Sequence, residues 1–298
     1  MIICDTHCDT LYSRAVHPGK KTDITVPRLK KAGISLQTMA MFVGGRNDTE
    51  SKRAAYKKML AEAEKLKEEG LKQVFSPDEA TGTESAFMLS VEGCDLLDEE
   101  PSLIGEWREK GVRMAALTWN WENRIGTPAC IDQEAPLKPD GKSIVKELLA
   151  AGIACDISHL SRRGVWDLLE MGVVPLASHS CCDALHACPR NLTDEQLRAL
   201  FSAGGYVGVN FYPAFLTQGK AQISDVVQHL LHMLEMGGEG RIGFGSDFDG
   251  IECKPKGLAS PLGVKKLIEA LRGEGLSEEQ VCGIAGENLI AYYRRAGL

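Results

Sequence analysis

The sequence lacks a long apolar run, a basic segment near its start and an excess of positive charge. No stretch approaches the roughly 18 consecutive apolar residues of a membrane span, and the opening residues Met1–Asp5 do not begin a secretory signal peptide. The formal net charge of −7 argues against a nucleic-acid or anionic-membrane partner, because binding phosphates requires a basic surface. We therefore expect a soluble cytoplasmic protein.

The sequence also lacks a Cys-x-x-Cys pair, although it contains ten cysteines between Cys4 and Cys282. Scattered cysteines without an export signal are typical of reduced thiols in a reducing compartment. No low-complexity linker divides the chain. Its 298 residues exceed the usual length of one domain, but α/β barrels reach this size as a single unit. We predict a single domain over residues 1–298.

Short apolar runs recur along the whole chain, each bounded by glycine, proline or polar turn residues. Runs that are continuously apolar, without alternation, are typical of strands covered on both faces of a parallel sheet. The predicted strands are Met1–Cys4, Ser35–Val43, Ala86–Val91, Val112–Thr118, Ile153–Ile157, Val173–Ala177, Tyr206–Asn210 and Arg241–Gly245.

Amphipathic helical segments separate the predicted strands. Ser51–Glu69 carries apolar residues at helical spacing and stops at Gly70, and Asp225–Met236 places its valines and leucines on one face. Thr193 and Gln196 have the spacing of a capping box at a helix start. This alternation predicts an α/β fold, a (β/α)8 TIM barrel, with a doubly wound open sheet as the alternative.

Histidines and carboxylates follow the predicted strands, at the end of a barrel where functional side chains lie. His7 and Asp9 are two residues apart in extended chain, so both side chains point to one side and can bind one cation. His159 and His179 end successive strands and can converge on a second cation, and Glu92 could bridge the two. Imidazole and carboxylate ligands suit Zn²⁺, and also Mn²⁺ or Co²⁺.

Two cations about 3.5–4 Å apart would hold a shared hydroxide as nucleophile and polarise a scissile carbonyl. Asp247, after the last strand, is the best candidate for the proton shuttle. Each residue also has an ordinary structural interpretation: Glu92 as a solvated turn carboxylate, His159 as a loop residue and Asp247 as a turn residue. We interpret the remaining four histidines as structural or solvated. His229 and His232 fall on the polar side of a predicted helix, and His17 and His186 lie in loops.

The ordered set of motifs at these strand ends resembles the membrane (renal) dipeptidase family of zinc metallopeptidases, in particular its soluble bacterial members. The resemblance covers roughly residues 3 to 290. It is carried by Asp5-Thr6-His7-Cys8-Asp9, Val91-Glu92-Gly93, Asp156-Ile157-Ser158-His159, Ser178-His179-Ser180, Arg190-Asn191-Leu192, Val209-Asn210-Phe211-Tyr212 and Gly245-Ser246-Asp247-Phe248-Asp249-Gly250.

The resemblance implies a metallo-dependent hydrolase barrel, two zinc ions and a homodimer. One zinc would be held by His7, Asp9 and Glu92, and the other by Glu92, His159 and His179, with Glu92 and Asp247 taking part in catalysis. Arg190 would bind the C-terminal carboxylate of a dipeptide, helped by Tyr212; a planar guanidinium suits this role because it grips a carboxylate bidentately.

One position departs from the best-known family members. Where they carry a histidine thought to contact the substrate, this chain has Trp119, which offers an indole N–H and a large apolar face but no acid or base. We expect Trp119 and the adjacent Asn120 to contact the substrate, with an altered substrate range.

The function expected from the resemblance is metal-dependent hydrolysis of L,L- and also L,D-dipeptides. The alternative is a related binuclear amidohydrolase acting on an N-acyl amino acid or a lactam. Such relatives often bridge their metals with a carboxylated lysine, and here Glu92 takes that position. A metal-binding or partner-binding protein without catalysis would have lost a ligand or Asp247, and none is missing.

Overall fold

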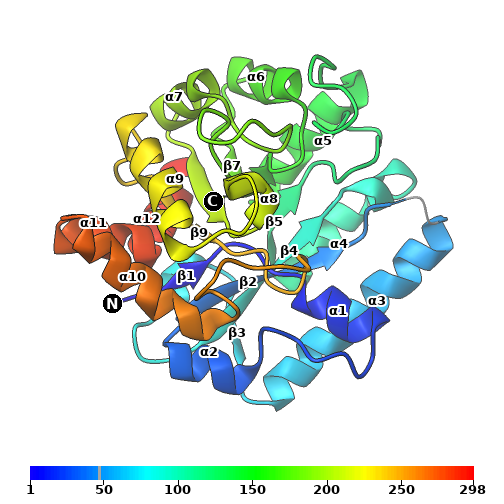
Figure 1. Ribbon diagram of the computed structural model, residues 1–298. Helices are drawn as coiled ribbons and strands as arrows, with labels where there is room; N and C mark the ends of the chain where they lie inside the picture. The colour runs from blue at the N-terminus through cyan, green and yellow to red at the C-terminus, as the bar shows by residue number, and fades with distance from the viewer. Residues whose placement is uncertain (46–47) are drawn as a thin grey trace.

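A closed barrel of parallel strands forms the centre of the molecule, with helices around it (Figure 1). The computed structural model describes residues 1–45 and 48–298. Within this part of the chain no helix is both long enough and apolar enough to cross a membrane. The strands are β1 Cys4–Asp5, β2 Leu36–Phe42, β3 Lys72–Gln73, β4 Ala86–Glu92, β5 Val112–Ala116, β6 Ala154–Asp156, β7 Leu176–Ser180, β8 Tyr206–Asn210 and β9 Ile242–Gly245.

Hydrogen bonding between β2 and β4 closes the barrel, which confirms the (β/α)8 fold and excludes the doubly wound open sheet. The order around the sheet is β2-β1-β9-β8-β7-β6-β5-β4, and each of the eight predicted strands overlaps one of these. The additional strand β3 was not predicted. It has two residues and pairs only with the start of β4, so it is too short to give a periodic signal.

The α-helices are α1 Thr10–Val16, α2 Val26–Ala32, α3 Thr49–Glu68, α4 Leu103–Lys110, α5 Pro139–Ala150, α6 Arg162–Glu170, α7 Asp194–Ser202, α8 Pro213–Leu216, α9 Ile223–Glu235, α10 Val264–Gly273, α11 Glu278–Cys282 and α12 Asn288–Ala296. A π-helical turn, Gly283–Glu287, joins α11 to α12. The predicted capping box is present: the Thr193 hydroxyl accepts from the Gln196 N–H, and the Gln196 side chain accepts from the Thr193 N–H.

Continuous burial explains why the strands read as apolar runs rather than as alternating patterns. All seven residues of β4 are buried, as are all five of β5 and of β8. One face of each strand fills the barrel interior and the other packs under the helices, so neither face needs to be polar.

Glycines let the strands β7, β8 and β9 approach closely near their carboxyl ends. The Thr6 hydroxyl donates to the carbonyl oxygens of Ser178 and Phe244, at 2.5 and 2.8 Å, and so links β7 to β9. A Cβ atom at Gly208 or at Gly245 would overlap the Ser178 carbonyl and crowd the Thr6 hydroxyl. These two positions therefore have to remain glycine for the polar contacts to form.

We predict that Gly245→Ala lowers the free energy of unfolding by at least about 1–3 kcal/mol, the usual cost of overpacking a core. The control is Gly105→Ala on α4, where a Cβ meets nothing within 4 Å. That exposed helical change should raise stability by up to about 1 kcal/mol. Urea denaturation of both variants measures the difference; equal midpoints would refute the constraint at Gly245.

Candidate metal centre and substrate pocket

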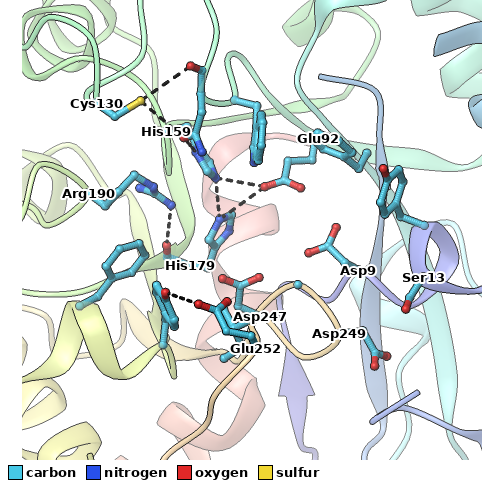
Figure 2. A pocket seen from close by; sticks show the side chains of 18 of the residues that line it. Asp9, Ser13, Glu92, Cys130, His159, His179, Arg190, Asp247, Asp249 and Glu252 are labelled. Carbon is cyan, nitrogen blue, oxygen red and sulfur yellow. Dashed lines mark hydrogen bonds and ion pairs between the residues drawn. The ribbon is translucent and has the colours of Figure 1, made fainter. Parts of the chain in front are cut away.

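A cavity of about 600 Å³ opens at the carboxyl ends of the barrel strands (Figure 2). This volume lies within the range of about 300–1,000 Å³ that is usual for ligand pockets. Most of the predicted site residues line it: Asp9, Glu92, Trp119, Asn120, His159, His179, Arg190, Tyr212 and Asp247. The structure therefore brings to one place residues that lie more than two hundred positions apart in sequence.

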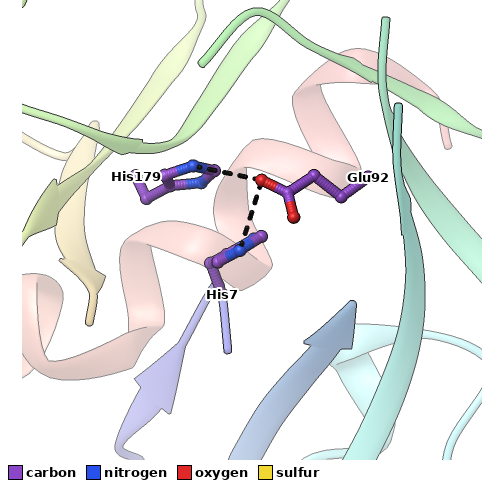
Figure 3. A group of neighbouring side chains, drawn as sticks. All are labelled: His7, Glu92 and His179. Carbon is purple, nitrogen blue, oxygen red and sulfur yellow. Dashed lines mark ion pairs between the residues drawn. The ribbon is translucent and has the colours of Figure 1, made fainter. Parts of the chain in front are cut away.

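Three histidines lie around one oxygen of Glu92, and Figure 3 shows two of them, His7 and His179. Glu92 Oε1 lies 3.0 Å from His159 Nε2, 3.7 Å from His179 Nε2 and 3.8 Å from His7 Nε2. The Nε2 atoms of His159 and His179 are 3.0 Å apart. All four side chains are buried.

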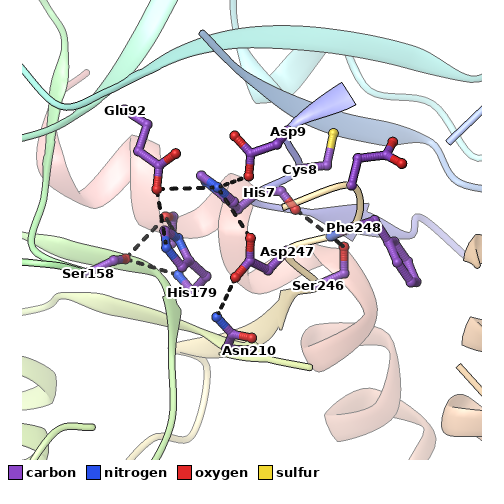
Figure 4. A network of polar contacts seen from close by, with 12 residues as sticks. His7, Cys8, Asp9, Glu92, Ser158, His179, Asn210, Ser246, Asp247 and Phe248 are labelled. Carbon is purple, nitrogen blue, oxygen red and sulfur yellow. Dashed lines mark hydrogen bonds and ion pairs between the residues drawn. The ribbon is translucent and has the colours of Figure 1, made fainter. Parts of the chain in front are cut away.

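Two aspartates complete the group on the side of His7 (Figure 4). His7 Nε2 lies 3.3 Å from Asp9 Oδ2 and 3.8 Å from Asp247 Oδ1. The other carboxylate oxygen of Asp247 accepts a hydrogen bond from Asn210 Nδ2 at 3.0 Å, which orients the carboxylate toward the cavity. The Tyr212 N–H in turn donates to Asn210 Oδ1 at 2.6 Å and fixes that amide.

The outer nitrogens of two histidines show which ring nitrogen carries the proton. Asn120 Oδ1 lies 3.0 Å from His159 Nδ1, and an amide oxygen can only accept. Ser178 Oγ lies 2.7 Å from His179 Nδ1 and donates its own proton to Asp156 Oδ2 at 2.5 Å, so it accepts from the imidazole. Both rings therefore carry hydrogen on Nδ1 and direct the Nε2 lone pair into the cavity.

Electrostatics in the cavity favours the neutral form of His159 and His179 but the protonated form of His7. Burial, reinforced by Arg190 and His7, lowers the pKa values of His159 and His179 well below the ordinary range. Burial and the charge of Asp9 raise the pKa of Glu92 well above its usual value. At His7 burial alone would lower the pKa, but the carboxylates of Glu92, Asp9 and Asp247 outweigh it and raise this pKa to about 10.

This arrangement fits a divalent cation. Two imidazole lone pairs face each other at 3.0 Å, and the buried Nε2 atom of His7 makes no hydrogen bond within the described part of the chain. Two groups with ligand atoms mutually within 4.8 Å are His7, Glu92, His179 and His7, Asp9, Asp247. Neutral imidazoles with carboxylates are ligands that Zn²⁺ and similar metals prefer.

The loop after β9 is shaped to keep the cavity open beside Asp9. Asp247 and Asp249 both adopt positive φ, 63° and 67°, a conformation that aspartate tolerates better than most residues. A Cβ atom at Gly250 would strike the carboxylates of Asp9 and Asp247. Asp249 binds the Thr10 hydroxyl at 2.6 Å and the Asp23 N–H at 2.6 Å, and so ties this loop to the start of α1.

Arg190 occupies the opposite side of the cavity from Asp9 (Figure 2). Its guanidinium is buried, lies 5.3 Å above the centre of the Phe215 ring, and donates from Nη2 to the His179 carbonyl at 3.4 Å. Nη1 is buried and has no hydrogen-bond partner among residues 1–45 and 48–298. A buried guanidinium nitrogen without an acceptor suits an anionic group of a ligand.

The other residues predicted to contact substrate are Tyr212, Asn120 and Trp119, and each of them contacts another side chain at the cavity. The Tyr212 hydroxyl donates to Glu252 Oε1 at 2.8 Å, and Asn120 holds His159 as described above. The Trp119 ring packs against Phe42, with centroids 4.6 Å apart, and lies 6.2 Å from the His159 ring. All three residues line the cavity, so their predicted role in binding substrate remains a prediction compatible with their positions.

Several residues of the site were not singled out from the sequence. Asn210 is the last residue of β8, and the strand-end rule that found the ligands could also have assigned it a role. Asp156 and Ser178 belong to the quoted strand-end motifs, but their role beneath the site depends on contacts that the sequence does not show. His17 lines the cavity, and His229 is buried rather than on a polar face, with Nδ1 accepting from the Cys182 N–H at 3.0 Å.

Comparison with known proteins places these features in a family. The family described as membrane dipeptidase, peptidase family M19, matches residues 1–296. An uncharacterised dipeptidase of Schizosaccharomyces pombe is 34% identical over 214 residues, covering 70% of this chain and 52% of the relative. The dipeptidase aclJ of Aspergillus oryzae is 31% identical over 216 residues, covering 68% and 50%. The chain thus spans about half the length of these curated relatives.

Solved structures with the same fold cover nearly all of the chain. A metallopeptidase of Rhodobacter sphaeroides, bound to a phosphinate mimic of the dipeptide L-Ala-D-Ala, superposes with a TM-score of 0.90 at 21% identity. A dipeptidase of family M19 superposes with the same TM-score at 22% identity. In both cases 99% of each chain is covered. These matches establish the barrel fold.

We predict that Ser178→Ala weakens metal binding by about 10- to 100-fold, the usual effect of removing a group that orients a ligating histidine. Ser180→Ala is the matched control, because it lies on the same strand and its buried hydroxyl has no hydrogen-bond partner in the described chain. Competition with a chromogenic chelator measures both affinities. Equal affinities in the two variants would exclude a role for the Asp156–Ser178 contact.

Proposed function

The chain belongs to the membrane dipeptidase family, and from this premise we propose that it hydrolyses dipeptides with a free C-terminal carboxylate in a metal-dependent reaction. The observation that carries the proposal is the buried guanidinium of Arg190, whose Nη1 has no hydrogen-bond partner among the described residues, in the same cavity as a cluster of side chains that could hold metal ions. A binding site for the carboxylate therefore stands beside the place where the scissile bond would lie.

The ligand cluster divides into two sets around Glu92. His7 and Asp9 would hold one zinc ion with Glu92, and His159 and His179 would hold a second with the same carboxylate, with manganese or cobalt as substitutes. When bound, such cations act as Lewis acids on the scissile carbonyl and supply a nucleophile at neutral pH. The distances of 3.0–3.8 Å from Glu92 Oε1 to the three histidines support this sharing.

Asp247 would move the proton. Its Oδ1 faces the ligand cluster, and its Oδ2 is held by Asn210, so one oxygen is free to act while the other fixes the carboxylate. A carboxylate in this position can take a proton from the attacking water and return it to the leaving amine. Glu92 orients the three imidazoles, and the Nδ1 contacts of His159 and His179 keep their Nε2 atoms unprotonated.

Arg190 would bind the C-terminal carboxylate and so limit the substrate to two residues. The Phe215 ring beneath the guanidinium and the His179 carbonyl beside it hold Arg190 in place before the ligand arrives. Tyr212, whose hydroxyl donates to Glu252, would help to bind the carboxylate end of the substrate. The bound L-Ala-D-Ala mimic in the Rhodobacter sphaeroides relative supports extending the substrates from L,L- to L,D-dipeptides.

A homodimer, a single domain and a cytoplasmic location stay predictions from the sequence.

We predict that the purified protein contains about two zinc ions per chain and cleaves L,L- and L,D-dipeptides in a ninhydrin assay. Chelation should abolish cleavage, and added zinc, manganese or cobalt should restore it. Bound metal without dipeptide cleavage would transfer the function to another amide, such as an N-acyl amino acid. No metal and no activity under any loading would refute a catalytic function.

Asp247→Asn is the control for this experiment. The asparagine keeps the size of the side chain and its contact with Asn210 but cannot take up a proton. Metal content should stay at the wild-type level while turnover falls by about 100-fold or more, within the range for loss of a general base. Wild-type turnover in this variant would remove Asp247 from proton transfer.

We predict that Arg190→Ala lowers kcat/KM by about 100-fold or more for free dipeptides, the effect of losing a charged hydrogen bond of roughly 3 kcal/mol. For dipeptide amides, which lack the carboxylate, the loss should be much smaller. Steady-state kinetics on each free and amidated pair separates the two effects. An equal loss for both would contradict the carboxylate-binding role.

A further inference from the structure

A row of aromatic side chains forms one wall of the cavity, and the proposed reaction does not use it. Tyr12 from α1 meets Phe42 at the end of β2, with ring centroids 5.0 Å apart and planes at 90°. Phe42 then meets Trp119, in the loop after β5, at 4.6 Å and 68°. We call Tyr12, Phe42 and Trp119 the aromatic wall. All three are partly exposed and line the cavity.

The aromatic wall lies beside the ligand cluster. Phe42 is the direct neighbour of Glu92 across the β2–β4 pairing, and Tyr12 lies one helical turn after Asp9. Figure 2 shows Asp9 and Ser13, the residue next to Tyr12, on the side of the cavity opposite Arg190 and Cys130. With the carboxylate of a dipeptide on Arg190 and its scissile bond at Glu92, the amino-terminal residue extends toward this wall.

The backbone at Gly44 packs closely against the wall. A Cβ atom at Gly44 would come within 2.8 Å of Trp119 Cβ and 3.2 Å of Phe42 Cε2, so the two rings are packed onto bare backbone. The edge-to-face contacts fix the ring planes relative to one another. A preformed apolar surface of this kind binds a large apolar side chain with little loss of conformational freedom.

Polar and charged groups also line the cavity that contains the aromatic wall. His17 lies next to Tyr12, with ring centroids 6.1 Å apart, and Lys20 also lines the cavity. A lysine or arginine side chain could stack on aromatic rings, but its charged group would lose hydration on an apolar surface. An aromatic or branched apolar side chain has no such penalty.

We propose that the aromatic wall is the subsite for the amino-terminal side chain and selects dipeptides whose first residue is aromatic or large and apolar. This inference rests on the proposed dipeptidase function. It names the position at which the enzyme discriminates between dipeptides, and it assigns Trp119 to recognition of an apolar side chain. Tyr12 and Phe42 are specificity-determining residues in the same subsite.

The test compares kcat/KM of the metal-loaded enzyme for Phe-Ala, Leu-Ala, Gly-Ala, Lys-Ala and Glu-Ala. We expect Phe-Ala and Leu-Ala to exceed Gly-Ala by at least about tenfold, the lower limit for a missing apolar group in a hydrophobic pocket. They should exceed Lys-Ala by a similar factor. Equal values for Phe-Ala and Gly-Ala, or a preference for Lys-Ala or Glu-Ala, would overturn the subsite while leaving the dipeptidase function standing. No cleavage of any of the five would overturn the proposed function itself.

Phe42→Ala locates the preference on the wall. The ratio of kcat/KM for Phe-Ala to that for Gly-Ala should fall by about tenfold, and Phe42→Leu, which retains apolar volume, should lower it less. Phe75→Ala makes the same change at an exposed ring outside the cavity and should leave the ratio at its wild-type value. If Phe42→Ala fails to fold, Tyr12→Ala replaces it with the same expectation. An unchanged ratio in a folded wall variant contradicts the proposal.

Discussion

The convergence of three imidazole Nε2 atoms on one oxygen of Glu92 is the constraint around which this barrel is organised. His7, His159 and His179 come from three different strand ends, and their rings are buried. Facing lone pairs and crowded carboxylates repel one another in a medium of low dielectric constant. A bound cation would relieve this repulsion, so the fold holds in place a group of residues whose lone pairs and carboxylates are suited to a positively charged ligand.

Two buried aspartates beneath the cavity hold the strand ends in this arrangement, and they do so in the same way. Asp5 accepts from the N–H and the hydroxyl of Ser246, at 2.8 and 2.5 Å, and joins β1 to the end of β9. Asp156 accepts from the N–H and the hydroxyl of Ser178, at 3.0 and 2.5 Å, and joins β6 to β7. Each carboxylate thereby fixes the register of the strands that carry the histidines, and the Asp156 contact also sets the protonation of His179.

The cavity differs in chemistry from one side to the other, which gives it a direction. On one side is the buried guanidinium of Arg190, which lies over the Phe215 ring. Its Nη1 atom has no hydrogen-bond acceptor among the described residues. On the other side Tyr12, Phe42 and Trp119 present apolar ring faces. A small molecule with a carboxylate at one end and an apolar group at the other can match both sides in a single orientation. Specificity of this kind depends on placement, because each element alone is common on protein surfaces.

The sequence by itself determined the barrel and the types of ligand. Continuous apolar runs identify strands buried on both faces, and the carboxyl ends of parallel strands meet at one end of a barrel, so His7, Glu92, His159, His179 and Asp247 could be expected to meet. Only the tertiary structure decided which atoms face each other. The tautomer of His179, the hold of Asn210 on Asp247, the burial of His229 and the aromatic wall all depend on contacts between residues far apart in sequence. Periodicity reports which face of an element is buried, whereas side-chain direction and partner are fixed by how neighbouring strands and loops pack.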